Sequence, residues 1–144
     1  MQIDPIIKLD DYWPYQVSVL ADLIAKHTTS VLKAHGDLNL SQWRVLAAVA
    51  ELPGRTAAEV VTVTPMDKGI VSRATATLVA DGILEKIGDA DDKRRSRLYV
   101  TNSGAKSYQA IRKALTSQTA GVQTKTSLNT DLLLAIKKMK QLNI

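Results

Sequence analysis

The densest positive charge in the chain lies between residues 93 and 97, where four of the five residues are cationic. These residues are Lys93, Arg94, Arg95 and Arg97. Arginines that project from a thin turn can enter the minor groove of DNA, where the electrostatic potential is most negative. A charged turn that serves only solubility has the same composition, so the surrounding elements must decide between these two interpretations.

A second candidate surface lies on the helix predicted over residues 65–81. At 100° per residue, Val71, Ala74 and Leu78 fall on one side of this helix. The opposite side, which is small and polar with one long cation, consists of Gly69, Ser72, Arg73 and Ala76, with Lys68 and Ile70 on its flanks. Such a face can enter a major groove about 12 Å wide, where Arg73 could reach a guanine edge or a phosphate. The alternative is the solvated face of an ordinary amphipathic helix.

Three helix-start signals lead up to this second surface. Ser41 can cap a helix that stops at Pro53. Thr56 opens a short helix and Thr64 opens the helix over residues 65–81, and each has an acidic residue three positions later, as in a capping box. Two short helices separated by a few residues, the second strongly capped, are typical of a helix-turn-helix.

The pattern changes from helix to strand after Gly82. Leu84 and Ile87 indicate a strand, residues 88–96 a turn, and residues 97–100 a returning strand. A hairpin directly after a recognition helix is a wing, and the cationic cluster then lies at its tip. The predicted fold class is therefore mainly α with a small β-hairpin wing, a winged helix-turn-helix. The stretch between the second and third helices is compatible with a further short strand.

The remaining helices are predicted over residues 11–35, 101–120 and 127–142. One apolar stripe of the last helix consists of Leu128, Leu132, Ile136 and Met139. A head of about 65 residues cannot cover these helices as well as its own core, and a two-fold symmetric mate is the commonest partner. We therefore expect N- and C-terminal dimerisation helices in a homodimer. The alternative is a compact monomer with these helices folded back on the head.

Three segments make up the expected organisation of the 144 residues. Residues 1–37 form an N-terminal arm and dimerisation helix, residues 38–101 the winged helix-turn-helix, and residues 102–144 the C-terminal dimerisation helices. Because 45% of the residues are hydrophobic while phenylalanine is absent, the core must be mostly aliphatic.

Composition argues against several classes of function. The absence of cysteine excludes disulfides, thiolate metal sites and thiol-based redox sensing in this chain. Glycine-rich phosphate loops and common hydrolase motifs are missing, and the only histidines, His27 and His35, lack neighbouring ligands, so we expect no enzyme, no metal site and no cofactor. No apolar run reaches the roughly 18 residues of a membrane span, and the start of the chain lacks the features of a signal peptide, which predicts a cytoplasmic protein. A net charge of +5 suits a polyanionic partner.

The hairpin and the helices before it carry stretches of recognisable pattern. D-D-K-R-R-S-R-L-Y-V-T fits the signature D-x-R-x-x-x-[LV]-x-[LV]-T through Asp92, Arg94, Leu98, Val100 and Thr101. This signature resembles the wing of the MarR family of winged helix-turn-helix transcriptional regulators. M-D-K-G-I-V-S-R, A-D-G-I-L-E-K and L-S-Q-W-R-V-L-A are similar to that family's recognition helix, its run into the wing and its second helix. The resemblance covers residues 38–104.

The resemblance implies a homodimer whose two winged heads bind a pseudo-palindromic duplex. Arg94 matches the family's minor-groove wing arginine, and Gly69 and Arg73 fall where its recognition helix contacts DNA. Ile70 stands where the family often has serine or threonine, so it could touch a thymine methyl but cannot hydrogen-bond a base. Asp92, an unexpected acid beside phosphate-binding cations, can accept from turn amides or orient an arginine.

Many proteins of this family respond to small, often aromatic, acids bound between the head and the dimerisation helices. The candidates for such a pocket are Trp13, Tyr15, His27, Trp43 and Arg44. Each has a plainer interpretation. Trp43 and His27 could be core residues, and Arg44 could be a surface or ion-pair residue. Trp13 and Tyr15 could simply pack across the dimer.

The predicted function is a sequence-specific regulator of transcription that binds duplex DNA, a repressor relieved by a small ligand such as an aromatic acid. The alternative is a winged helix that serves as a protein-interaction module and binds an acidic partner through its wing. Binding to DNA with a steep dependence on salt would separate the two functions.

Overall fold

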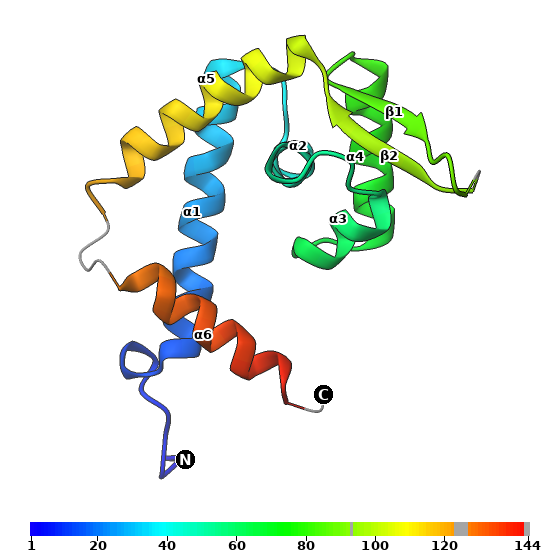
Figure 1. Ribbon diagram of the computed structural model, residues 1–144. Coiled ribbons are helices and arrows are strands. Elements are labelled where there is room, and N and C mark those ends of the chain that lie inside the picture. Colours follow the sequence, from blue (N-terminus) through cyan, green and yellow to red (C-terminus); the bar gives the residue numbers. More distant parts are fainter. Residues whose placement is uncertain (93, 123–126, 143–144) are drawn as a thin grey trace. The chain divides into compact units, whose positions relative to one another are not determined.

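The computed structural model describes residues 1–92, 94–122 and 127–142 (Figure 1). After a 3₁₀ turn at Leu9–Asp11, the elements are α1 (Trp13–His35), α2 (Leu40–Glu51), α3 (Ala57–Val63), α4 (Lys68–Ala80), β1 (Leu84–Gly88), β2 (Ser96–Val100), α5 (Asn102–Thr119) and α6 (Leu128–Lys140). This order confirms the predicted mainly helical fold with one hairpin. The chain divides into two compact units, residues 1–111 and residues 112–144.

An aliphatic core joins the elements of the winged helix in the first unit. Its fully buried side chains come from α2, α3, α4 and both strands, and include Val45, Leu46, Val49, Val60, Val71, Leu78, Leu84 and Leu98. Figure 1 shows the β1–β2 hairpin beside α4, which it contacts through β1. Burying these side chains fixes the orientation of α4 relative to the hairpin, and thus the relation between the two candidate surfaces.

Two helices in this head begin at caps other than the predicted ones. Asn39, not Ser41, caps α2: its Oδ1 accepts from the Gln42 N–H at 2.8 Å, while Gln42 Oε1 accepts from the Asn39 N–H at 3.0 Å. Asp67, not Thr64, caps α4 and accepts from the Ile70 N–H at 2.8 Å. At α2, Gln42 returns a hydrogen bond to the Asn39 N–H, which favours Asn39 as the cap. At α4, the negative charge of Asp67 suits the positive end of the helix dipole.

The start of α3 agrees with the prediction. Thr56 Oγ1 accepts from the Glu59 N–H at 3.2 Å and opens α3. Thr64 donates instead to the Val60 carbonyl at 2.8 Å, at the end of α3. Gly82, with φ of 72°, follows α4 and turns the chain into β1.

Antiparallel pairing holds the hairpin in a single register, with Leu84 opposite Val100 and Ile87 opposite Arg97. The turn between α2 and α3 runs along the free edge of β2. There the Gly54 N–H donates to the Leu98 carbonyl at 2.9 Å, and the Leu98 N–H donates to the Arg55 carbonyl at 3.0 Å. A pair of backbone hydrogen bonds therefore stands where the sequence was compatible with a short strand.

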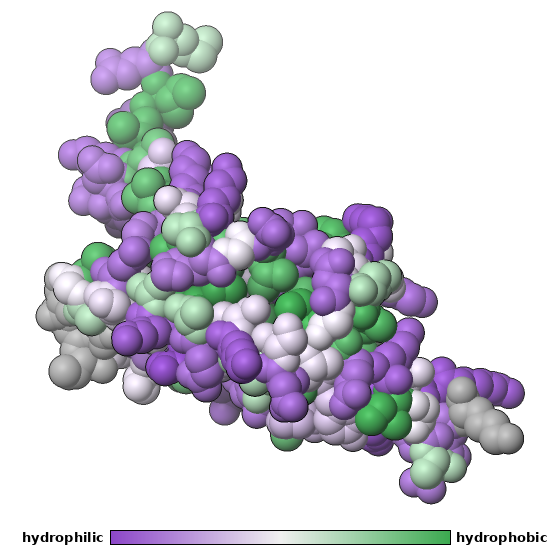
Figure 2. All heavy atoms as spheres, turned by 90° about the horizontal axis from the view of Figure 1, so that it is seen from above, coloured by the Kyte–Doolittle hydropathy of each residue, from purple (hydrophilic) through white to green (hydrophobic). Residues whose placement is uncertain are grey.

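Large apolar side chains remain exposed on the terminal elements. In α1 they include Leu20, Leu23 and Ile24, and in α6 they include Leu133, Ile136 and Met139, each at least 40% exposed. Figure 2 shows apolar residues in green among polar ones on one face of the molecule, with mostly hydrophilic residues toward the right-hand end. No helix in the described part of the chain combines the length and the apolar character needed to cross a membrane.

Candidate nucleic-acid interface

The two faces of α4 divide as the helical periodicity predicts. Val71, Ala74 and Leu78 are at most 5% exposed and belong to the core. The outward face carries Gly69, Ser72, Arg73 and Ala76, all exposed, together with Lys68. Ile70 is half-buried and packs against the core from the flank. Since the core fixes one side of α4, the other side is presented to solvent as a rigid surface.

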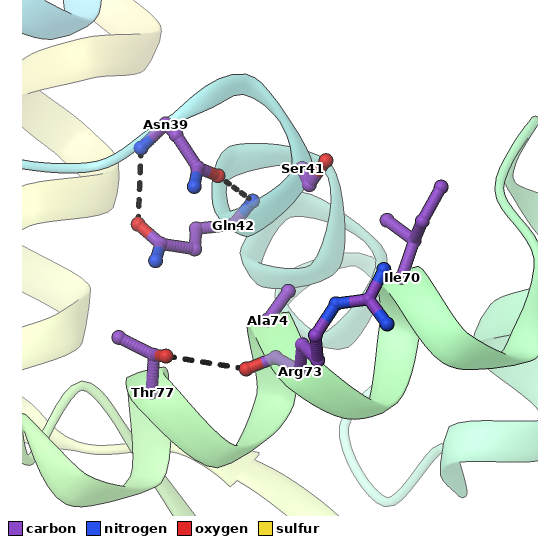
Figure 3. Close-up of a pocket in the computed structure, with 7 residues that line it drawn as sticks. All are labelled: Asn39, Ser41, Gln42, Ile70, Arg73, Ala74 and Thr77. Atoms are coloured by element: carbon purple, nitrogen blue, oxygen red, sulfur yellow. Dashed lines mark hydrogen bonds between the residues drawn. The ribbon is translucent and has the colours of Figure 1, made fainter.

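A polar hollow of about 320 Å³ lies between this face and the start of α2 (Figure 3). Its lining consists of Asn39, Ser41, Gln42, Ile70, Arg73, Ala74 and Thr77. Figure 3 shows the Arg73 side chain running toward Ile70 and the first turn of α4 rather than toward Asn39. Gly69 leaves room for this path, because a Cβ there would lie 3.3 Å from Arg73 Nη1. The hollow thus joins one cation to the hydroxyl and amide groups of a neighbouring helix start.

The wing cations differ in their partners. Arg97 donates through Nη1 to the Gly54 carbonyl at 3.1 Å, and its Nη2 lies 3.2 Å from Asp89 Oδ2. Arg95 Nη2 lies 3.5 Å from Glu59 Oε1 of α3. Within the described residues, the Arg94 guanidinium makes no hydrogen bond or ion pair, and its side chain is free to reach a ligand. Lys93, the fourth predicted wing cation, lies outside the described residues.

Two acids organise the wing turn. The Asp92 carboxylate accepts from the Arg94 N–H at 2.9 Å, which is the turn-amide role expected of it. Asp89 accepts from the Asp91 N–H at 3.0 Å, and this bond, followed by the nearby charges of Arg97 and Arg95, holds the pKa of Asp89 below its ordinary 3.8. Asp89 therefore remains an anion near neutral pH.

The candidate ligand residues fall into two separate groups. Trp43 is half-buried and stacks on Tyr108 of α5, with ring centroids 5.5 Å apart and planes at 21°. Trp43 and Arg44 line a hollow of about 260 Å³ between α2 and the end of α3. Trp13 and Tyr15, in contrast, are exposed in the first turn of α1. Along α1, Trp13 lies roughly 22 Å from Thr28, which is the first buried residue of this helix.

His27 is exposed on α1, so within this chain it is not a core histidine. In the described part of the chain, no group of three or more histidine, aspartate or glutamate side chains is arranged to hold a metal ion.

Sequence reasoning missed several residues of this surface. The Gly54 carbonyl accepts from Arg97, which lies 43 residues later, and Glu59 pairs with Arg95, which lies 36 residues later. Nothing in the local pattern marks Gly54 or Glu59 as a partner. Tyr108 is also not identified from the sequence as the partner of Trp43, although its place on the helix predicted over residues 101–120 is a signal that could have found it. Asp89 was part of the predicted turn without a role of its own.

Comparison with known proteins finds one family model and several similar structures. A model described as the MarR family matches residues 36–95. No curated protein sequence matches the chain. Among solved structures, a MarR-family transcriptional regulator from Silicibacter pomeroyi is similar with a TM-score of 0.78 and 23% identity, covering 96% of this chain and 94% of that one.

Two further structures are similar at lower TM-scores. A mutant of MepR from S. aureus, bound to an oligodeoxyribonucleotide, has a TM-score of 0.60 and 20% identity over 89% of this chain and 95% of that one. BpsR of Bordetella bronchiseptica, whose DNA binding is regulated by 6-hydroxynicotinic acid, has a TM-score of 0.63 and 20% identity over 88% and 99% of the two chains. At these identities the likeness establishes the fold.

Proposed function

We propose that this chain is a member of the MarR family, whose model matches residues 36–95, and that it is a cytoplasmic, homodimeric regulator of transcription that binds duplex DNA in a sequence-specific manner. The observation that carries the proposal is a pair of available arginines on one rigid head. Arg73 stands on the exposed face of α4, and Arg94 stands at the wing tip without a partner among the described residues. A helix face and a hairpin tip of this kind match a major groove and the adjacent minor groove.

The chemistry of the α4 face favours DNA over an acidic protein. Gly69, Ser72 and Ala76 are small enough to let the helix axis approach base edges closely. Arg73 is then the long donor among these small residues, and Lys68 at the flank is placed for a phosphate. A major groove about 12 Å wide admits a helix face of this kind. The oligonucleotide bound to the MepR relative supports the same assignment.

Dimerisation follows from the exposed apolar side chains of α1 and α6. Leu23, Leu133 and Ile136 are each more than 50% exposed in the single chain. A second copy of the chain is the commonest cover for such surfaces. Full-length protein should sediment as a dimer at micromolar concentration, and deletion of residues 127–144 should give monomers or aggregates. A monomeric full-length protein would contradict this part of the proposal.

We further propose repression that is relieved by a small aromatic acid, as the 6-hydroxynicotinic acid response of the BpsR relative suggests. The pocket residues would be Trp43 and Arg44 of one copy, with Trp13, Tyr15 and His27 as candidates for the side that dimerisation completes. A thermal-shift screen of aromatic acids, followed by competition against bound duplex, tests this. If every acid that raises the Tm leaves DNA affinity unchanged, relief by such ligands is wrong.

The deciding experiment for DNA binding is a selection on random duplexes, followed by a salt titration of the selected site. We expect a pseudo-palindrome with half-site centres roughly 10 bp apart, or a whole-turn multiple of that spacing. The slope of log K against log salt should correspond to roughly 6–10 phosphates per dimer. Enrichment of no duplex, together with capture of the protein on an acidic polypeptide, would favour a protein-interaction module instead.

A further inference from the structure

The cations of the wing do not share one role. Arg94 has no partner among the described residues, whereas Arg97 is held at both sides of its guanidinium. One nitrogen donates to the carbonyl of Gly54 in the turn between α2 and α3, and the other pairs with Asp89 at the end of β1. The Asp89 side chain is only 9% exposed, so this pair is partly shielded from water.

The turn that Arg97 reaches is itself fitted closely to β2. Two backbone hydrogen bonds connect Gly54 and Arg55 to Leu98. Gly54 has φ of 92°, a conformation that favours glycine, and a Cβ there would lie 3.3 Å from the Tyr99 hydroxyl oxygen. Arg97 adds a side-chain hydrogen bond to the same backbone segment. Its ion pair then extends the connection across the hairpin to Asp89.

We infer that Arg97 and Asp89 form a brace that fixes the wing to the turn between α2 and α3, so that Arg97 positions Arg94 for DNA instead of contacting DNA itself. This inference rests on the proposed function. It deepens that function by naming a positioning residue among the four wing cations. The wing is a two-stranded hairpin, and such hairpins are only marginally stable without further contacts. Where the tip arrives in a groove therefore depends on contacts at its base.

The substitution Asp89→Asn should change DNA affinity in opposite directions for the two possible roles of Arg97. If Arg97 contacts a phosphate, loss of the neighbouring negative charge should strengthen DNA binding. If Arg97 braces the wing, loss of the ion pair should weaken it. Asparagine keeps an oxygen that can accept from the Asp91 N–H, so the turn hydrogen bond is retained. We expect binding weaker by a factor of about 2 to 3 for each wing, and about 4 to 10 for a dimer.

A matched pair of variants separates positioning from contact by salt dependence. Arg97→Gln and Arg94→Gln each remove one cation from the same hairpin. Loss of a cation that neutralises DNA charge, at a phosphate or in the minor groove, lowers the magnitude of the salt slope by about 0.9 for each wing. We expect this decrease for Arg94→Gln. Arg97→Gln should weaken binding several-fold with an unchanged slope, and Arg97→Lys should restore part of the affinity by keeping the charge near Asp89.

A readout without DNA completes the test. The Leu98 N–H, which donates to the Arg55 carbonyl, should exchange with solvent faster in Arg97→Gln and Asp89→Asn than in wild type, and should be unaffected in Arg94→Gln. Stronger DNA binding by Asp89→Asn, or a slope for Arg97→Gln that falls as it does for Arg94→Gln, overturns the brace. If wild-type protein binds no duplex, the proposed function fails, while the exchange rates still decide whether the pair holds the wing.

Discussion

Gly104 lies where α5 begins against the base of the wing, and the substitution Gly104→Ala should destabilise the protein. A methyl group at this buried position would overlap the carbonyl oxygen of Ile83 and would lie 3.0 Å from Val100 Cγ1. The same carbonyl accepts from the Thr101 N–H at 3.1 Å, and Thr101 Oγ1 accepts from the Gly104 N–H at 3.0 Å. The Ile83 carbonyl therefore cannot turn away without breaking the junction.

Two opposing terms set the expected magnitude. In an ordinary helix, alanine is more favourable than glycine by about 1 kcal/mol. Overpacking against a well-packed interior costs about 1–3 kcal/mol, and here the methyl meets backbone that is already hydrogen-bonded rather than a movable side chain. Because the overlap is with fixed backbone, we take the upper end of the steric cost, about 3 kcal/mol, which leaves a net loss of about 2 kcal/mol after the propensity gain. For a chain of this size, that loss lowers the Tm by about 8 °C.

The assay is urea unfolding of wild type, Gly104→Ala and a matched control, Gly69→Ala, at one protein concentration. Gly69 also lies in the first turn of a helix, but a methyl there meets only Arg73 Nη1 at 3.3 Å and Asp67 Oδ1 at 3.4 Å. Both are ends of side chains that can move aside, so the control keeps the propensity gain and should be as stable as wild type or up to about 1 kcal/mol more stable. Equal stability of the two variants would refute the reasoning, because the close approach of α5 to Ile83 would then carry no energetic cost.

The remaining predictions concern the caps, the two free arginines and pH. Asn39→Ala should lower the free energy of unfolding by about 1 kcal/mol, measured by urea unfolding, because it removes the Oδ1 that accepts from the Gln42 N–H, while the backbone N–H of residue 39 can still donate to Gln42 Oε1. Arg73→Ala should relax base preference at one position of each half-site, whereas Arg94→Ala should weaken binding broadly and flatten any A·T preference at the flanks; a binding-site selection at fixed salt distinguishes these outcomes. The pKa of Asp89 is lowered from 3.8 by the Asp91 N–H and nearby arginines, so its carboxylate stabilises the fold above that pH and the contribution is lost as pH falls through the lower folded-state pKa. The difference in free energy of unfolding between wild type and Asp89→Asn should thus be level from about pH 8 to about pH 5 and shrink in stronger acid.

Most of the fold was predictable because its periodicity is strong and local. The spacing of Val71, Ala74 and Leu78 identified the buried face of α4, and the change of period after Gly82 located the hairpin. The helix starts were less predictable. Each of two starts offers more than one good capping residue within a few positions, and only reciprocal bonding or charge selects Asn39 and Asp67.

The candidate site was predictable in composition but not in its connections. Residue types placed Arg73 and Arg94 on exposed surfaces, because one opposes a buried face and the other lies in a turn. The partners of Arg97 and Arg95 are distant in sequence and belong to other elements. Their ion pairs depend on how the hairpin docks on the turn before α3, and that docking results from packing of the whole head.

The acids within the basic wing show why charge density alone overstates the number of DNA contacts. From the sequence, carboxylates beside phosphate-binding cations are unexpected, since they would repel a polyanion. In the folded wing two of them have local structural roles, because Asp92 bonds the backbone of the turn and Asp89 pairs with Arg97. A carboxylate that neutralises one arginine costs the wing some attraction for phosphate, yet it gives the hairpin a fixed base. The acids thus indicate that this wing uses part of its positive charge for orientation, and under the proposed brace Arg94 would depend on that orientation to reach a groove.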